Sequence, residues 1–295
     1  MNARTDRIEI TARSIADSRG DPTVEVEIRL GVVAAVASAP AGKTKGGDEA
    51  RTVPIAHAIS NVHEVILPLV RTVNADLSSH RGLIEVEQRL IERAGANCIE
   101  LGANALLPVS IALWRCAAQL HGLELYEYIR AYEPELAGFR RVRLFSNVLN
   151  GGYHALRKDP LQENDWDGLE RLATEIKERG VMVVGDDFYV TQKSRLEKGI
   201  AAASANGLLV KPNQNGSLHG TIEVMKLARR HGIELVISHR SGETLDDTIA
   251  DLAVAVGAFG IKAGAPQPES IFPDPVAWVR RKKYLRLIAI DEGRE

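Results

Sequence analysis

Charged and hydrogen-bonding residues follow four short apolar runs in the second half of the chain. The runs lie at about 181–185, 207–210, 235–237 and 259–261, and the polar residues that follow them are Asp186, Lys211, Ser238, His239, Arg240, Ser241 and Lys262. One carboxylate, two ammonium groups, a guanidinium and an imidazole together suit a small anionic ligand. Any one of these residues alone is more often a loop or capping residue, so the interpretation depends on the repetition at four run ends.

The elements that must position these residues are strands that alternate with helices. A helix-length segment separates each apolar run from the next, and short continuous apolar runs are typical of buried parallel strands. In parallel α/β sheets and barrels the ligand lies at the carboxyl ends of the strands, so these side chains should meet at one edge. A further strand is predicted at 142–149, which makes five in this part of the chain.

The first part of the chain predicts an α+β domain. Apolar and polar residues alternate from Val24 to Leu30, which is typical of a half-buried strand in a meander. Pro108 fits the first turn of a helix, because the first helical position needs no backbone N–H donor. Helical patterns are found at about 55–73, 83–94 and 108–121. We therefore expect two domains, at 1–135 and 139–295.

Composition narrows the class of protein. The chain has 295 residues, of which 45% are hydrophobic, and this is enough for the cores of one or two domains. A net charge of −2 gives no reason to expect nucleic-acid or membrane binding. No apolar stretch reaches the length of a membrane span, and the first residues lack the apolar core of a signal peptide. Cys98 and Cys116 show no metal-ligand spacing, so we expect buried thiols in a cytoplasmic protein.

Longer motifs resemble those of the enolase family. The most distinctive is Ser238-His239-Arg240-Ser241-Gly242-Glu243-Thr244, and other motifs that resemble the family lie at 17–26, 101–105, 150–155, 209–214 and 260–266. These motifs are ordered and spread over almost the whole chain. The resemblance implies an α/β protein with an enolase-like N-terminal α+β domain, followed by a TIM-type β/α barrel.

The barrel is predicted to be shortened. A (β/α)₈ barrel takes about 250 residues and each strand–helix unit about 30, so the residues from 139 onward have room for about five units. The family's Asn-Gly-Gly-x-His motif at 150–154 runs almost directly into Lys158-Asp159-Pro160, whereas a long segment separates the matching motifs in enolases. The absent segment would hold the second, third and most of the fourth strand. The remaining strands predict one curved sheet in the order fifth, sixth, seventh, eighth, first.

The resemblance also implies chemistry: the reversible dehydration of 2-phosphoglycerate to phosphoenolpyruvate in glycolysis, with Mg²⁺. Lys211 would be the general base, and Lys262 would hold the substrate carboxylate and stabilise the enolate. Arg240 and Ser241 would bind the phosphate. The remaining residues of the implied site are His154, Ser238 and His239 around the substrate, and Asp186 and Thr44 at the metal ions.

Part of the family's metal and acid machinery has no counterpart in this sequence. Of three metal carboxylates the resemblance retains Asp186, while another falls at Lys158 and the third lies in the absent segment with the glutamate that assists hydroxyl departure. One carboxylate is a weak site for Mg²⁺, which prefers octahedral oxygen coordination.

Two functions therefore remain open. One is a phosphopyruvate hydratase, and the other is a catalytically deficient paralogue that binds a phosphorylated carboxylate or serves as an assembly partner. The two open edges of the predicted sheet, and the dimers common in the family, favour a homo-oligomer.

Overall fold

The computed structural model describes residues 3–43, 46–138, 140–145, 165–177, 179–264 and 275–293. Its N-terminal sheet is the predicted meander, in which neighbouring strands pair antiparallel in the order β1-β2-β3. The strands are β1 (Glu9–Ala16), β2 (Pro22–Leu30) and β3 (Val33–Ser38). Alternate residues of β2 are buried against the helices, which explains the alternating pattern in the sequence.

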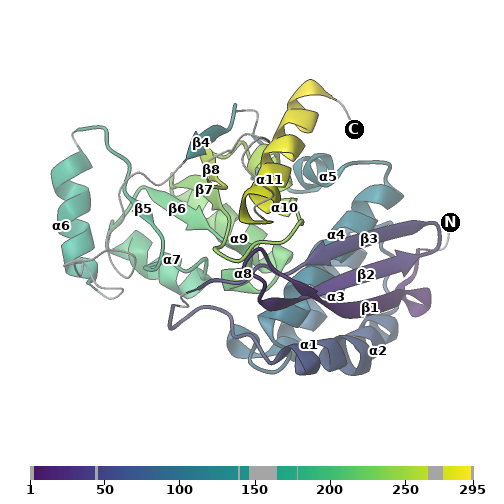
Figure 1. The fold of residues 1–295 in the computed structure, drawn as a ribbon. Helices are drawn as coiled ribbons and strands as arrows, with labels where there is room; N and C mark the ends of the chain where they lie inside the picture. Colours follow the sequence, from purple (N-terminus) through teal and green to yellow (C-terminus); the bar gives the residue numbers. More distant parts are fainter. Residues whose placement is uncertain are drawn as a thin grey trace.

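Helices cover one face of this sheet (Figure 1). The predicted helical stretch at 55–73 is confirmed as α1 (Ile55–Asn61), a π-helical turn at Val62–Ile66 and α2 (Leu67–Val73) in direct succession. They are followed by α3 (His80–Ala94), α4 (Ala103–Leu120) and α5 (Leu125–Tyr132). Nearly every residue of α4 is buried, because it packs against β2 and β3 and also against helices of the C-terminal part.

The predicted start of α4 at Pro108 is wrong. The helix begins five residues earlier, at Ala103, after Gly102, whose φ of 85° ends the preceding turn. Pro108 lies inside the helix, where it cannot donate a hydrogen bond to the carbonyl of Asn104. The side-chain amide of Asn104 accepts a hydrogen bond from the Val53 N–H and donates one to the Val53 carbonyl. These two bonds hold the first turn of the helix.

The C-terminal sheet has five strands within the described residues, and all of its strand pairs are parallel. Its order is β4-β8-β7-β6-β5, which confirms the predicted order. The strands are β4 (Arg143–Phe145), β5 (Val184–Gly185), β6 (Gly207–Val210), β7 (Glu234–Ser238) and β8 (Gly260–Lys262). Residues 146–149 of the strand predicted at 142–149 lie outside the described residues.

Helices join these strands as in a shortened β/α barrel (Figure 1). They are α6 (Trp166–Lys177), α7 (Lys193–Ala201), α8 (Pro212–Asn215), α9 (Leu218–Arg230), α10 (Thr248–Ala255) and α11 (Pro275–Glu292). The helix α11 packs beside α10. A single cluster of buried apolar residues includes members of both sheets. In the ranges that the structure describes, no helix is both long and apolar enough to cross a membrane.

Candidate functional site

The register of the parallel sheet places three predicted residues side by side. Val210 pairs with Ile237, and Ile237 with Ile261, so Lys211, Ser238 and Lys262 occupy the next level across β6, β7 and β8. Asp186 follows β5 at the same edge of the sheet. We call Asp186, Lys211, His239 and Lys262 the strand-end site.

The closest contact in the strand-end site joins Lys211 and Asp186. The Lys211 ammonium donates a hydrogen bond to Asp186 Oδ1 and forms an ion pair with it. The side chain of Lys211 is only 12% exposed, whereas that of Asp186 is 36% exposed. The carboxylate nearest to Lys211 is therefore already neutralised by it.

Lys262 lies in the same group but has no carboxylate of its own. Within the described part of the chain its ammonium forms no ion pair or hydrogen bond, and its side chain is partly buried. Burial lowers the pKa of Lys262, the carboxylate of Asp186 acts in the opposite direction, and the charge of Lys211 lowers it further. These influences show that the three groups interact closely.

His239 follows β7 and lies among cations. Burial is the main cause that lowers the pKa of His239 to about 3, followed by the charges of Arg280, Lys262, Lys283 and Lys211. Its backbone N–H donates to the Lys262 carbonyl over 2.8 Å, and its buried Nδ1 has no hydrogen-bond partner among the described residues. The imidazole is neutral at neutral pH, and it marks a strongly positive environment.

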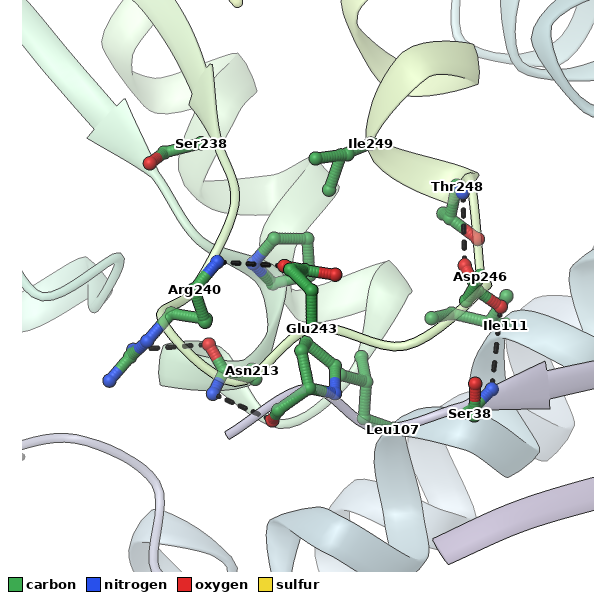
Figure 2. Close-up of a pocket in the computed structure, with 12 residues that line it drawn as sticks. Ser38, Leu107, Ile111, Asn213, Ser238, Arg240, Glu243, Asp246, Thr248 and Ile249 are labelled. Carbon is green, nitrogen blue, oxygen red and sulfur yellow. Dashed lines mark hydrogen bonds between the residues drawn. The ribbon is translucent and has the colours of Figure 1, made fainter. Parts of the chain in front are cut away.

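The guanidinium of Arg240 points toward Asn213, which follows Lys211 by two residues (Figure 2). Its guanidinium donates to Asn213 Oδ1 over 3.1 Å and to Glu49 Oε2 over 3.0 Å. The side chains of Arg240 and Glu49 are each 6% exposed, so this is a buried ion pair between the two parts of the chain. The backbone N–H of Arg240 donates to Glu243 over 2.7 Å. A phosphate at Arg240 would have to share the guanidinium with Glu49.

The two serines of the motif make local contacts. Ser241 Oγ accepts hydrogen bonds from the Lys43 backbone N–H over 2.7 Å and from Arg19 Nη1 over 3.3 Å. Ser238 is buried, and its hydroxyl donates to the His239 carbonyl over 3.0 Å. Ser241 thus ties the loop before residue 44 to the end of β7. Thr44 and His154, the other predicted site residues, lie outside the described residues.

A small pocket lies beside Arg240 rather than over the strand-end site (Figure 2). Leu107 and Ile111 of α4 form its apolar wall, and Asn213, Arg240 and Glu243 are among its polar lining residues. These polar groups bind one another, because Arg240 donates hydrogen bonds to both Glu243 and Asn213. This pocket belongs to the contact between the two parts of the chain.

The described residues do not provide a donor set for Mg²⁺. Across the described ranges, no group of three His, Cys, Asp or Glu side chains could hold a metal ion. Asp186 has the neighbouring carboxylate of Asp187, but Asp186 is bound to Lys211. Mg²⁺ prefers six oxygen ligands in octahedral geometry, so a single paired carboxylate does not fit it.

Sequence reasoning missed four residues that contact or influence these groups: Glu49, Asn213, Arg280 and Lys283. Asn213 follows the lysine strand directly and could have been found from that position. Arg280 and Lys283 belong to a basic run at 280–283 that is typical of a solvent-exposed helix face. Fully buried Lys283 instead forms an ion pair with Glu243 over 3.1 Å.

Comparisons with known proteins agree with this architecture. The model of the enolase N-terminal domain matches residues 8–129, and that of the enolase C-terminal TIM barrel domain matches residues 153–273. Similar curated proteins are the enolases of Corynebacterium kroppenstedtii and Thermococcus gammatolerans, each 28% identical, and that of Methanopyrus kandleri, 29% identical. Each alignment covers 97% of this chain and 94–95% of the relative.

The alignments also locate the length difference within the chain. The first of them spans 428 positions, whereas the chain has only 295 residues, so at least 133 positions have no counterpart here. Because the alignment covers 97% of this chain and 95% of its relative, those positions are mostly internal. Two family models in the family's order and curated relatives along nearly the whole length lead to one conclusion: the chain belongs to the enolase family.

Proposed function

We propose that this chain binds a small phosphorylated carboxylate at the strand-end site and has little or no hydratase activity of its own. Family membership supports an enolase-like lyase, and enolases generally use Mg²⁺ and a phosphorylated carboxylate. The observation that carries the proposal is the pairing of Lys211 with Asp186 beside Lys262, which has no carboxylate partner within the described residues.

The ligand class follows from charge. Lys262 is a partly buried ammonium beside a second ammonium and the neutral His239. A partly buried cation without a counterion is costly, and an anionic ligand removes that cost. We propose that the ligand's carboxylate lies at Lys262, and that Arg240 and Ser241 hold its phosphate. Ser238, His239 and His154 would complete the binding set.

The weak turnover follows from the same pair. A general base must reach the proton that it accepts, but the side chain of Lys211 is bound to Asp186. We propose that Asp186 and Thr44 occupy the positions of the family's metal ligands, although the described residues do not fit Mg²⁺. The internal segment absent from this chain would have carried the other carboxylates and the acid that assists hydroxyl departure.

The second candidate function is the full reaction, the dehydration of 2-phosphoglycerate to phosphoenolpyruvate in glycolysis. The juxtaposition of Lys211 and Lys262 across β6 and β8 favours it, because this reaction needs a base and a cation beside the enolate. Turnover would then require the missing carboxylates to come from another chain.

We also propose a homo-oligomer in the cytoplasm, with domains at 1–135 and 139–295. Among the described strands, β4 and β5 are each paired on one side only, which leaves two edges for pairing with another copy. The two thiols, Cys98 and Cys116, are free and buried, as in proteins of a reducing compartment.

Calorimetry tests the binding proposal. We expect 2-phosphoglycerate and phosphoenolpyruvate to bind the full chain, with an affinity that falls as salt is added. Lys262→Ala should weaken binding by at least about tenfold, the loss of one hydrogen bond to a charged group. Lys193→Ala removes an exposed lysine of α7 and should leave binding unchanged. Absence of binding at millimolar ligand by a folded protein would refute the proposal.

A further inference from the structure

The side chain of Arg280 reaches the strand-end site from α11. It lies against Gly264, two residues after Lys262: a Cβ atom at Gly264 would be 2.6 Å from Arg280 Cδ and 2.9 Å from Nε. Gly264 has a φ of 84°, a conformation that favours glycine. The absence of a side chain at Gly264 therefore leaves the space that Arg280 occupies.

The guanidinium of Arg280 also acts on the end of the neighbouring strand. Among the four cations that lower the pKa of His239, Arg280 has the largest effect. Arg280 therefore lies against the backbone after β8, and its charge acts on the residue after β7. Lys262 belongs to the same two strand ends.

Arg280 differs from the other cations on its face of α11. Residues 280, 283 and 286 are spaced by three, so they lie on one side of the helix. Lys283 is paired with Glu243, and Arg286 with Asp251 over 2.6 Å. Arg280 has no hydrogen bond or ion pair within the described residues. Among the described residues, carboxylates thus pair with Lys283 and Arg286 but not with Arg280.

We propose that Arg280 binds the phosphate group of the ligand together with Arg240 and Ser241, while Lys262 holds the carboxylate. This inference rests on the proposed function and adds a binding residue to it. A guanidinium presents two parallel N–H donors to a phosphate, a geometry that an ammonium lacks. Arg240, the phosphate residue implied by the family motif, shares its guanidinium with Glu49 and Asn213, so it can offer the phosphate only part of its donors. Arg280 adds a second guanidinium, which has no hydrogen bond or ion pair within the described residues.

The test compares Arg280→Gln with the parent chain by calorimetry, using 2-phosphoglycerate, inorganic phosphate and glycerate as separate probes. Lys282→Gln is the matched control, because it removes one positive charge from α11 at a position that does not share a face with Arg280. Gly264→Ala is a second variant, which displaces the Arg280 side chain without changing any charge. Thermal melts establish that each variant is folded.

We expect Arg280→Gln to weaken 2-phosphoglycerate and inorganic phosphate by roughly 10- to 100-fold, the loss of a hydrogen-bonded contact to a charged group. Gly264→Ala should weaken both in the same direction, and Lys282→Gln should change neither by more than about twofold. If the parent binds inorganic phosphate but not 2-phosphoglycerate, the proposed function fails, while a loss of phosphate affinity in Arg280→Gln still supports Arg280.

Three results would overturn the assignment of Arg280. One is unchanged phosphate affinity in a folded Arg280→Gln. Another is weakening that is confined to glycerate, which would place Arg280 at the carboxylate. The third is the absence of binding of every probe by the parent chain.

Discussion

Replacing Arg240 with Met should destabilise the protein even without a ligand. The substitution keeps most of the side-chain volume but removes the charge that faces Glu49. The carboxylate of Glu49 then stays buried beside two weaker donors, the Gly46 backbone N–H and the Gln214 amide, each at 3.1 Å. The expected loss in the free energy of unfolding is therefore the cost of a buried carboxylate that has lost its cation.

The magnitude follows from the burial of the pair. Both side chains are 6% exposed, so solvent screens the interaction weakly. Removing one partner of such a pair costs about 3–5 kcal/mol, and the two remaining donors to Glu49 favour the lower end. A loss of about 3 kcal/mol in a chain of this size lowers Tm by roughly 6–12 °C.

Calorimetric melts and urea unfolding of Glu49→Gln, Arg240→Met and the double variant measure the pair in a double-mutant cycle. We expect a coupling energy of about 2–3 kcal/mol, because the two residues are in direct contact. Arg230→Met is the matched control: its pair with Glu135 has a similar distance of 2.7 Å, but the side chains are 58% and 53% exposed. The control should change stability by less than about 1 kcal/mol. If Arg240→Met melts like the control, the buried pair does not join the two parts of the chain.

Three further predictions concern activity, pH and assembly. The chain should form phosphoenolpyruvate far more slowly than ~1 s⁻¹ with excess Mg²⁺, and faster turnover that Lys211→Ala abolishes would contradict this. Burial raises the pKa of Glu87 from 4.5 to about 7, so between these pH values the folded state retains a proton that the unfolded state releases. The free energy of unfolding should therefore fall by about 3 kcal/mol as the pH rises from 4.5 to above 7. Urea unfolding of Glu87→Gln should lack this dependence on pH. Sedimentation at micromolar concentration should show a dimer or larger species, and a 32.2 kDa monomer would count against it.

The strands of the C-terminal sheet could be predicted because burial on both faces requires continuous apolar runs. The helix boundaries were harder to predict. The residues from Ala103 to Leu107 are buried on every side of α4, so they show no amphipathic period, and Pro108 suggested a start that the structure places five residues earlier. Tertiary packing, rather than a capping residue, sets where this helix begins.

The candidate site was predictable as a set of residues but not as a set of partners. The motif identified Arg240, but its sequence contains no sign of Glu49, which is 191 positions away. Long-range ion pairs of this kind depend on how the two parts of the chain meet. For the same reason Arg280 and Lys283 were not identified from the sequence, although the charges of both act on His239.

Charge balance at the strand ends links the proposed weak turnover to the proposed ligand binding. Lys211 neutralises Asp186, and this leaves Lys262 and Arg280 as cations without carboxylate partners among the described residues. In the proposed function, such a site binds the ligand's carboxylate and phosphate before any proton has moved. An interaction that stabilises the bound substrate as strongly as the enolate lowers the dissociation constant but does not accelerate proton abstraction. Acceleration would need charge that acts on the enolate more strongly than on the substrate, together with a neutral base. Because Lys211 and Asp186 bind each other, neither the proposed base nor the proposed metal ligand is free of the other in the described part of the chain.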